Sequence, residues 1–306
     1  MKPDPIVILG PTASGKSDVA MALARAHPDV ELIAVDAMQV YRRMDIGTAK
    51  PTIDDLMAVQ HHCIDLVDPS DEFTVTDFAV AATEAIRVIE SRDDRPVLVA
   101  GTGLYLRSVT DPMEVPGRWP EVHAALLEHA EAEGVDTLHR QLVALDPTAA
   151  SKMEPTNTRR VVRALEVTLG SGRPFSSFGP GVDTYPPTRF HQFGLRWPRP
   201  VLTKRIADRV HRMIDGGLVA EVESLAAAPI SRTARQALGY KELFDYLDGI
   251  STLDAAIETI ITRTRQFAVR QERWFRRDPR IRWIDIDNDP VAEALPELER
   301  AWQISN

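Results

Sequence analysis

The chain opens with residues whose types and spacing can bind a diphosphate or triphosphate. An apolar run, 6–9, precedes a segment favourable for a helix, 18–26. Between them stand Gly10, Pro11, Thr12, Ala13, Ser14, Gly15, Lys16 and Ser17. A strand, a glycine loop and a helix in this order make a concave site of backbone N–H groups, to which Lys16 adds charge and Ser17 a hydroxyl for Mg²⁺. The pattern predicts a phosphate site, and a structural glycine turn is the alternative.

Two further polar residues follow apolar runs. Asp36 comes after the run 31–35, and Thr102 stands between two glycines after the run 96–100. Strands of a parallel sheet present their carboxyl ends to one crevice, so both should face the phosphate loop. Phosphotransferases with such a loop keep a Mg²⁺-binding Asp on a later strand, which here ends in Gly-Thr. Asp36 therefore fits a Mg²⁺ ligand, a general base or a helix N-cap, and Thr102 fits an N-cap or a phosphate contact.

Other polar positions have two interpretations each. His61 and His62 would point to opposite faces of an extended segment, so a shared metal ion is not expected. Arg235, followed by Gln236, could reach a phosphate or pair with a surface carboxylate. Arginines recur through 263–280, which is typical either of a solvated helix face or of a surface that binds RNA.

The composition is that of an ordinary globular protein. The 306 residues are 44% apolar and 26% charged, and the net charge of −9 argues against a protein that coats nucleic acid non-specifically. The one cysteine, Cys63, excludes an internal disulfide and a cysteine-based zinc site. The single cysteine makes a reducing cytoplasm the expected compartment, and no apolar run is long enough to span a membrane. With no surplus apolar stripe, we expect a monomer.

Short apolar runs alternating with helices favour an α/β fold with a P-loop NTPase-like parallel sheet flanked by helices. The expected strands are 5–9, 31–35, 63–67, 96–100, 189–196 and 281–286. Prolines and glycines then bound a stretch with only helical patterns. We therefore expect a core domain of residues 1–112 and 188–306, and a small all-helical insertion domain of residues 113–187.

Several segments together resemble one family, the tRNA dimethylallyltransferases, also called tRNA isopentenyltransferases. They occur in the family's order and span nearly the whole chain. The matching segments are GPTASGKS (10–17), VDAMQVYRRMDIGTAKP (35–51), HHCIDLVDPSDEFTVTDF (61–78), GTGLYL (101–106), NTRRVVRALEV (157–167), RQALGYKE (235–242) and RTRQFAVRQERWFRR (263–277). The DIGTAKP and RQALGY stretches are the most specific.

The resemblance implies transfer of a dimethylallyl group from dimethylallyl diphosphate to the exocyclic amine of an adenosine. That adenosine lies 3′ of the anticodon in tRNAs that read codons beginning with U. The phosphate loop, 10–17, would bind the prenyl diphosphate with Mg²⁺ on Ser17, assisted by Thr102 and Arg235. Asp36 would act as the general base, and no nucleotide would be hydrolysed.

The same resemblance implies a tRNA surface, with the insertion closing as a clamp over the anticodon loop. The residues expected on it are Asp36, Ala37, Met38, Gln39, Thr102, His123, Arg159, Arg160, Arg163, Arg235, Gln236, Lys241, Arg270, Gln271, Trp274 and Arg276. Ala37 replaces a serine found in many members, and Val269 a frequent lysine. The missing zinc-finger extension is typical of the bacterial type.

Three rival functions differ in what they predict. An enzyme that prenylates free adenine nucleotides would have little use for an arginine-rich helix. A small-molecule kinase would bind ATP in the phosphate loop. A nucleotide-gated RNA-binding module would bind tRNA whether or not Asp36 is intact, and would form no product.

Overall fold

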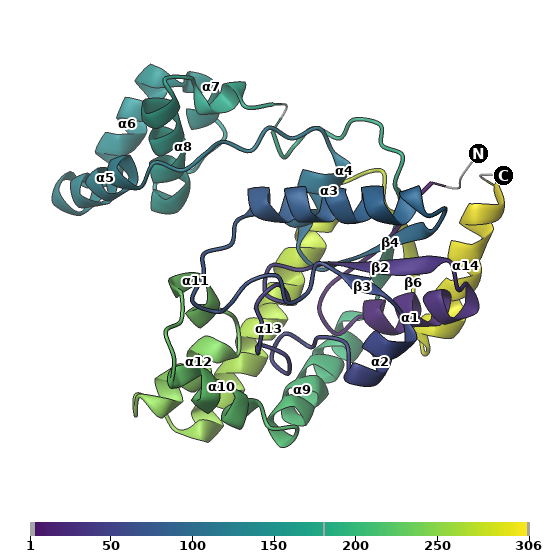
Figure 1. Ribbon diagram of the computed structural model, residues 1–306. Coiled ribbons are helices and arrows are strands. Elements are labelled where there is room, and N and C mark those ends of the chain that lie inside the picture. Colours follow the sequence, from purple (N-terminus) through teal and green to yellow (C-terminus); the bar gives the residue numbers. More distant parts are fainter. Residues whose placement is uncertain (1–3, 180, 305–306) are drawn as a thin grey trace. The chain divides into compact units, whose positions relative to one another are not determined.

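The computed structural model describes residues 4–179 and 181–304, and the chain forms two compact units (Figure 1). One unit comprises Met1–Thr110 and Pro187–Asn306, and the second comprises Asp111–Pro186. Within the described residues, no helix is both long and apolar enough to cross a membrane.

The first unit is built on a six-stranded sheet with the order β3-β2-β4-β1-β5-β6, in which every neighbouring pair is parallel. This confirms the predicted α/β fold with a parallel sheet. The strands are β1 (Ile6–Leu9), β2 (Val30–Val35), β3 (His61–His62), β4 (Arg95–Ala100), β5 (His191–Arg196) and β6 (Arg282–Asp285).

Helices connect these strands and cover the sheet (Figure 1). They are α1 (Lys16–Ala26), α2 (Ile53–Ala58), α3 (Val75–Ser91), α4 (Gly103–Thr110), α9 (Arg199–Asp215), α10 (Leu218–Ala226), α11 (Arg232–Arg235), α12 (Tyr240–Leu247), α13 (Leu253–Phe275) and α14 (Pro290–Ile304). N-cap residues in the sequence determine where several of these helices begin. Thr74 caps α3 and accepts the amide of Asp77, whose carboxylate in turn accepts the amide of Thr74.

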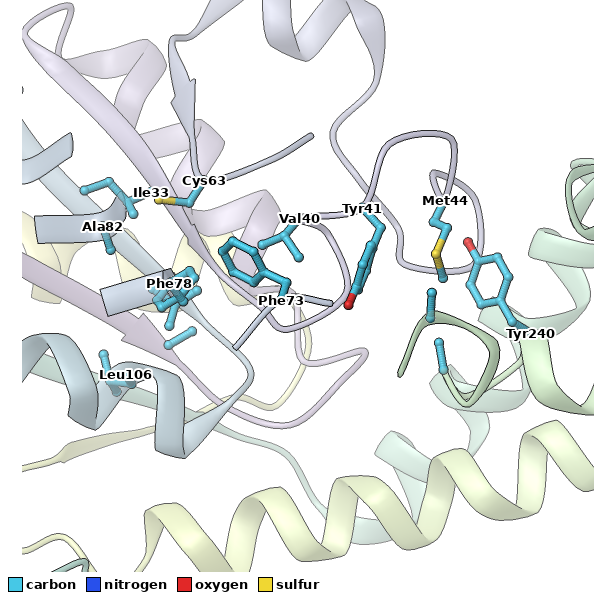
Figure 2. Close-up of a cluster of buried hydrophobic side chains, with 14 of the residues drawn as sticks. Ile33, Val40, Tyr41, Met44, Cys63, Phe73, Phe78, Ala82, Leu106 and Tyr240 are labelled. Atoms are coloured by element: carbon cyan, nitrogen blue, oxygen red, sulfur yellow. The ribbon is translucent and has the colours of Figure 1, made fainter. Parts of the chain in front are cut away.

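The central strands bury both of their faces. Val7 and Leu9 of β1 join a cluster with α3, α4, α10, α12 and α13, whereas Ile6 and Ile8 join a second cluster with α1, α9 and α14. Figure 2 shows part of the first cluster, where Phe78 of α3 lies between the sheet and Leu106 of α4. A sheet covered on both faces leaves its strand ends as the place for a ligand.

The second unit contains α5 (Pro120–Glu133), α6 (Val135–Leu145), α7 (Pro147–Ala150), α8 (Thr158–Ser171) and the short 3₁₀ helix η1 (Phe175–Ser177). Leu138, Leu142, Val161 and Leu165 form the centre of its own apolar cluster. Asn157 caps α8 by accepting the amide of Arg160 at 3.2 Å.

Two expectations about secondary structure are wrong. The third strand is only His61–His62, because Cys63 and Asp65 have φ of 62° and 52°, which an extended strand does not allow. The terminal helix α14, which has Pro296 in its interior, was not predicted. Pro290 stands at the first position of the helix, where proline is tolerated.

Candidate active site

The phosphate loop lies at the carboxyl end of β1, and side chains from several parts of the chain fix its shape. Trp197 Nε1 donates to the carbonyl of Ser14 at 2.9 Å, and Arg205 Nε donates to the carbonyl of Ala13 at 2.9 Å. Lys16 Nζ donates to the carbonyl of Pro11 at 2.8 Å. The Ser14 hydroxyl is buried without a partner among the described residues, an arrangement that suits an incoming oxyanion. The loop is therefore formed before any ligand arrives.

Gly10 and Gly15 make this loop possible. Gly15 has φ of 90° immediately before α1, in the left-handed region that favours glycine. A Cβ at Gly10 would lie 3.0 Å from the carbonyl oxygen of Leu195 and 3.1 Å from the Ser14 hydroxyl. The glycine spacing of the sequence pattern thus has a steric cause.

A cavity of about 810 Å³ lies beside the loop, and its cations exceed those predicted from the sequence. It is lined by Ser14, Lys16, Ser17 and, from α9, by Arg205, Arg209 and Arg212. Burial and the charge of Arg209 lower the pKa of Lys16 to about 7, and the charge of Asp36 opposes this. Burial lowers the pKa of Arg209 as well, again against Asp36. Lys16 and Arg209 line the same cavity, and two cations close together favour the binding of a multiply charged anion.

Sequence reasoning missed Arg209. It makes no hydrogen bond or ion pair to any described residue, so its guanidinium is available to a ligand. Arginines at 205, 209 and 212 recur every three to four residues, which places them on one face of a helix. That spacing was the available signal, but it also fits a solvated surface.

Asp36 and the Gly101-Thr102-Gly103 segment come together, as expected from the strand order. Asp36 Oδ1 accepts the amides of Met38 at 2.8 Å and Gln39 at 3.3 Å. A Cβ at Gly101 would lie 3.6 Å from Asp36 Oδ2. Thr102 precedes α4, and its carbonyl accepts the amide of Leu106 at 3.0 Å. One carboxylate oxygen thus orients the residue while the other faces the second loop.

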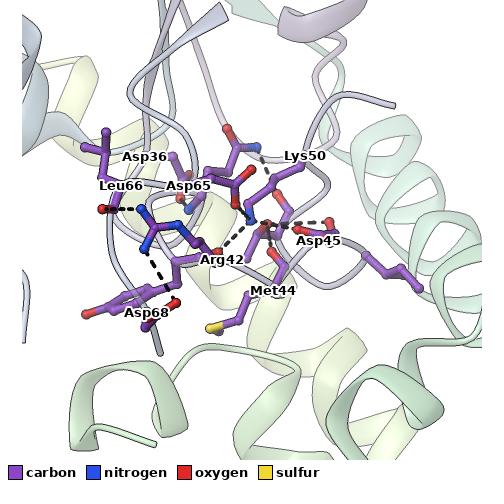
Figure 3. Close-up of polar contacts among 12 residues, drawn as sticks. Asp36, Arg42, Met44, Asp45, Lys50, Asp65, Leu66 and Asp68 are labelled. Atoms are coloured by element: carbon purple, nitrogen blue, oxygen red, sulfur yellow. Dashed lines mark hydrogen bonds and ion pairs between the residues drawn. The ribbon is translucent and has the colours of Figure 1, made fainter. Parts of the chain in front are cut away.

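The segment after Asp36 is held by a buried lysine (Figure 3). Lys50, whose side chain is 4% exposed, donates to Asp45 at 2.7 Å, to Asp65 at 2.6 Å and to the carbonyl of Tyr41 at 2.6 Å. Gln39 Nε2 closes the segment by donating to the carbonyls of Thr48 and Ala49 at 3.0 and 3.1 Å. The DIGTAKP stretch is therefore a support that fixes the position of Asp36.

Glu221 of α10 also holds the segment that follows Asp36, at residues 45–47. Its carboxylate accepts the amides of Asp45, Ile46 and Gly47 at 3.0, 2.8 and 3.3 Å, and the Tyr240 hydroxyl at 2.5 Å. A Cβ at Gly47 would lie 2.4 Å from the Tyr240 ring, so glycine is required there. The two most specific stretches of the sequence, DIGTAKP and RQALGY, meet at this contact.

Removing this anchor is expected to loosen the segment. Glu221→Ala leaves three amides without their acceptor, a loss of about 2 kcal/mol, which corresponds to roughly 30-fold faster exchange through local opening. Hydrogen exchange of the amides of residues 45–47 measures this. Glu223→Ala, an exposed change on the same helix, serves as the control. Unchanged protection in Glu221→Ala contradicts the interpretation.

Arg235 lies elsewhere than expected for a phosphate ligand. Its guanidinium pairs with Asp248 at 2.6 Å and lies 4.3 Å from the centre of the Phe244 ring, and it does not line the cavity beside Lys16. The surface ion pair is the interpretation that these contacts fit. Gln236 is exposed and Lys241 is half-buried beside it.

The arginine-rich helix is α13, and its two faces differ. Arg270 and Arg276 are exposed; Arg270 lies over Phe267, and Arg276 pairs with Glu272 at 2.6 Å. Trp274 packs against the Gly101-Thr102-Gly103 segment, so closely that a Cβ at Gly103 would lie 2.0 Å from its ring. Gln271 points inward and is 8% exposed, with its side chain on Thr12 and Gly101, and its expected contact with RNA stays a prediction.

In the second unit, Glu166 contacts two of the residues that were predicted to bind RNA. Its carboxylate is 4% exposed and contacts His123 Nδ1 at 3.0 Å and Arg163 at 2.7 Å. Arg163 also donates to the carbonyls of Pro116 and Gly117. Arg159 and Arg160 are exposed at the start of α8. His123 and Arg163 thus have structural contacts, whereas the side chains of Arg159 and Arg160 make no hydrogen bond or ion pair to the part of the chain that the structure describes.

No cluster of metal-binding side chains occurs in residues 4–179 and 181–304. His62 Nε2 contacts Glu31 at 2.6 Å and His61 Nδ1 contacts the carbonyl of Val59 at 2.8 Å, so the two histidines are held separately. Ser17 and Asp18, exposed in the first turn of α1, line the cavity beside the loop and carry oxygen groups.

Known proteins resemble this chain along its whole length. Residues 39–278 match the family model of the IPP transferases. A tRNA dimethylallyltransferase of Paenarthrobacter aurescens is 46% identical over 302 residues, covering 98% of this chain and 96% of that protein.

Solved structures agree. The tRNA isopentenylpyrophosphate transferase of Bacillus halodurans has a TM-score of 0.71 and 37% identity, covering 99% of this chain and 98% of its own. A eukaryotic dimethylallyltransferase acting on tRNA has a TM-score of 0.78 and 28% identity, covering 99% of this chain and 79% of its own. With the phosphate loop, the carboxylate and the cation-lined cavity in place, the chain belongs to the IPP transferase family.

Proposed function

We propose that this protein transfers a dimethylallyl group from dimethylallyl diphosphate to the exocyclic amine of the adenosine 3′ of the anticodon in tRNAs that read codons beginning with U. The observation that carries the proposal is the arrangement of Lys16 and Arg209 in one cavity, with the charge of Asp36 acting on both. Relatives of high identity are named for this reaction.

The proposed chemistry divides between the two sides of the site. The bond between the allylic carbon and the diphosphate oxygen breaks, and Lys16, Arg209 and the loop amides stabilise the leaving diphosphate. A new bond forms between the same carbon and the adenine nitrogen. That nitrogen gives up a proton, which Asp36 accepts as general base. Thr102, beside Asp36, is positioned to contact the incoming nucleotide.

Magnesium suits this donor set. Mg²⁺ in proteins is commonly held by one or two side-chain oxygens together with substrate phosphates and water, and Ser17 and Asp18 supply such oxygens. When bound, it would neutralise negative charge on the diphosphate.

The RNA would contact the exposed cations. We assign Arg270 and Arg276 of α13, together with Arg159 and Arg160 of the helical unit, to contacts with RNA phosphates. The helical unit, Asp111–Pro186, would act as the clamp on the anticodon loop. The target base must leave its stack, which costs a few kcal/mol, and phosphate contacts offset that cost. A single chain holds every residue assigned here, so we propose a monomer.

One assay tests the function against its rivals. Protein, Mg²⁺ and labelled dimethylallyl diphosphate are incubated with unmodified tRNA or with AMP, and ATP hydrolysis is followed in parallel. We expect label in tRNA only. Label in AMP indicates a nucleotide prenyltransferase, phosphate release from ATP a kinase-like activity, and tRNA binding without product a binding module. Each of these three outcomes overturns the proposal.

Diphosphate binding is expected to weaken as the pH rises above 7. The pKa of Lys16 is about 7 in the free protein, and a bound anion raises it, so binding above pH 7 takes up a proton. Affinity for pyrophosphate should therefore fall by up to about tenfold per pH unit above 7, and this contribution should vanish below it.

Calorimetry in buffers of different ionisation enthalpy measures the proton uptake. Pyrophosphate itself titrates, so the comparison is with Lys16→Arg, whose guanidinium remains charged throughout. The difference between the two pH profiles isolates Lys16. Parallel profiles would show that Lys16 does not titrate in this range.

A further inference from the structure

Gln271 of α13 bridges the two loops on which the proposed reaction depends. Its Oε1 accepts the amide of Thr12 in the phosphate loop at 2.9 Å, and its Nε2 donates to the carbonyl of Gly101 at 2.7 Å. These partners lie 259 and 170 residues away along the chain. The residue is 8% exposed, so the hydrogen bond to Gly101 is buried and the one to Thr12 is partly buried.

We propose that Gln271 is a positioning residue: it sets the separation between the loop that holds the prenyl diphosphate and the loop beside the base, Asp36. This inference rests on the proposed function. A primary amide fits the place because one end accepts and the other donates, which matches one N–H group and one carbonyl. The two partners also fix which end is which.

The bridge lies directly beside the reacting groups. A Cβ at Gly101 would lie 3.4 Å from Nε2 of Gln271 and 3.6 Å from Oδ2 of Asp36. The amide and the carboxylate therefore both lie close to Gly101. Thr12 belongs to the cradle whose other end carries Lys16. A change in the length of this bridge moves the leaving group relative to the base.

The position of Gln271 on its helix adds a second consequence. Arg270 and Arg273 flank it in the sequence and are exposed, whereas Trp274, three residues later, packs on Gly103. The inner face of α13 thus holds both loops, while its outer face carries the cations assigned to RNA. RNA that binds the outer face of α13 would therefore affect the positions of both loops through this helix.

The decisive variant is Gln271→Glu. As a carboxylate it can still accept the Thr12 amide but repels the Gly101 carbonyl, and it places negative charge near the diphosphate. As a neutral carboxylic acid it reproduces both hydrogen bonds of the amide. Burial beside a carbonyl raises the pKa of such a group. Lowering the pH should therefore protonate the introduced carboxylate and restore the hydrogen bond to the Gly101 carbonyl.

We expect kcat of Gln271→Glu to be about 10²-fold below wild type at pH 8, because small displacements of reacting groups cost about that much. Between pH 8 and pH 6 the ratio of variant to wild-type kcat should rise by about tenfold or more. Use of the ratio removes any pH effect that the variant and the wild type share. Gln266→Glu, the same change at an exposed position of α13, should follow the wild-type profile.

A second variant separates positioning from folding. Gln271→Met keeps the length and removes both polar ends, so its kcat should be low at every pH. Its pyrophosphate affinity should fall only a few-fold, since the cradle itself remains. A low, pH-independent ratio for Gln271→Glu would indicate a merely structural role and would overturn the proposal, as would wild-type kcat in either variant. If wild-type protein forms no prenylated tRNA, the proposed function fails instead, and the pyrophosphate measurement still tests the bridge.

Discussion

Asp36→Asn is expected to lower the rate of prenyl transfer by about 10²–10⁴, the usual contribution of a general base. The amide keeps an oxygen to accept the N–H groups of Met38 and Gln39, so the turn that positions residue 36 is preserved. What the variant lacks is a group that can accept the proton of the attacking amine. Affinity for tRNA should remain within a few-fold of wild type.

Single-turnover experiments with saturating tRNA and prenyl donor measure the chemical step directly. Binding of tRNA is followed separately, by filter binding at fixed salt, because phosphate contacts depend strongly on ionic strength. Asp54→Asn, an exposed change on α2, controls for the loss of one negative charge. Equal single-turnover rates in Asp36→Asn and wild type would remove Asp36 from the base role.

Arg209→Ala should be the second most damaging change. Loss of a preorganised donor to a developing oxyanion commonly costs about 10²–10³ in rate, and Arg209 has no other partner that would replace the diphosphate. The substitution also removes a charge that lowers the pKa of Lys16. The pH at which pyrophosphate binding begins to weaken should therefore move upward in the variant.

Two measurements check this pair of effects. Steady-state kinetics give kcat/KM for the prenyl donor, and calorimetry gives pyrophosphate affinity against pH. Lys204→Ala, an exposed cation on the same helix, should behave like wild type in both. Wild-type pyrophosphate affinity in Arg209→Ala would exclude Arg209 from the diphosphate site.

The sequence predicted the structure correctly where the local backbone or burial allows only one kind of residue. The phosphate loop needs glycine at 10 and 15 for steric reasons, so the pattern predicted it correctly. The strand runs ending at Leu9, Val35 and Ala100 were predicted well because they are apolar on both faces. Local propensity and burial agree in these segments.

Prediction failed where tertiary contacts decide. Arg209 and Arg235 are both arginines in helices, and only the packing of α9 and α11 determines which one reaches the cavity. Gln271 stands in an arginine-rich run, and its inward direction follows from the position of α13 over the loops. No single-sequence pattern contains that information.

The order of strands in the sheet has a consequence for biosynthesis. β1 pairs with β4 on one side and with β5 on the other, and the whole unit Asp111–Pro186 is translated between β4 and β5. At typical elongation rates, those residues take roughly 4 to 15 s to leave the ribosome. Through that interval one edge of β1 is an open template for other strands. Nascent chains stalled within the helical unit should therefore be the species most prone to aggregate and most dependent on chaperones.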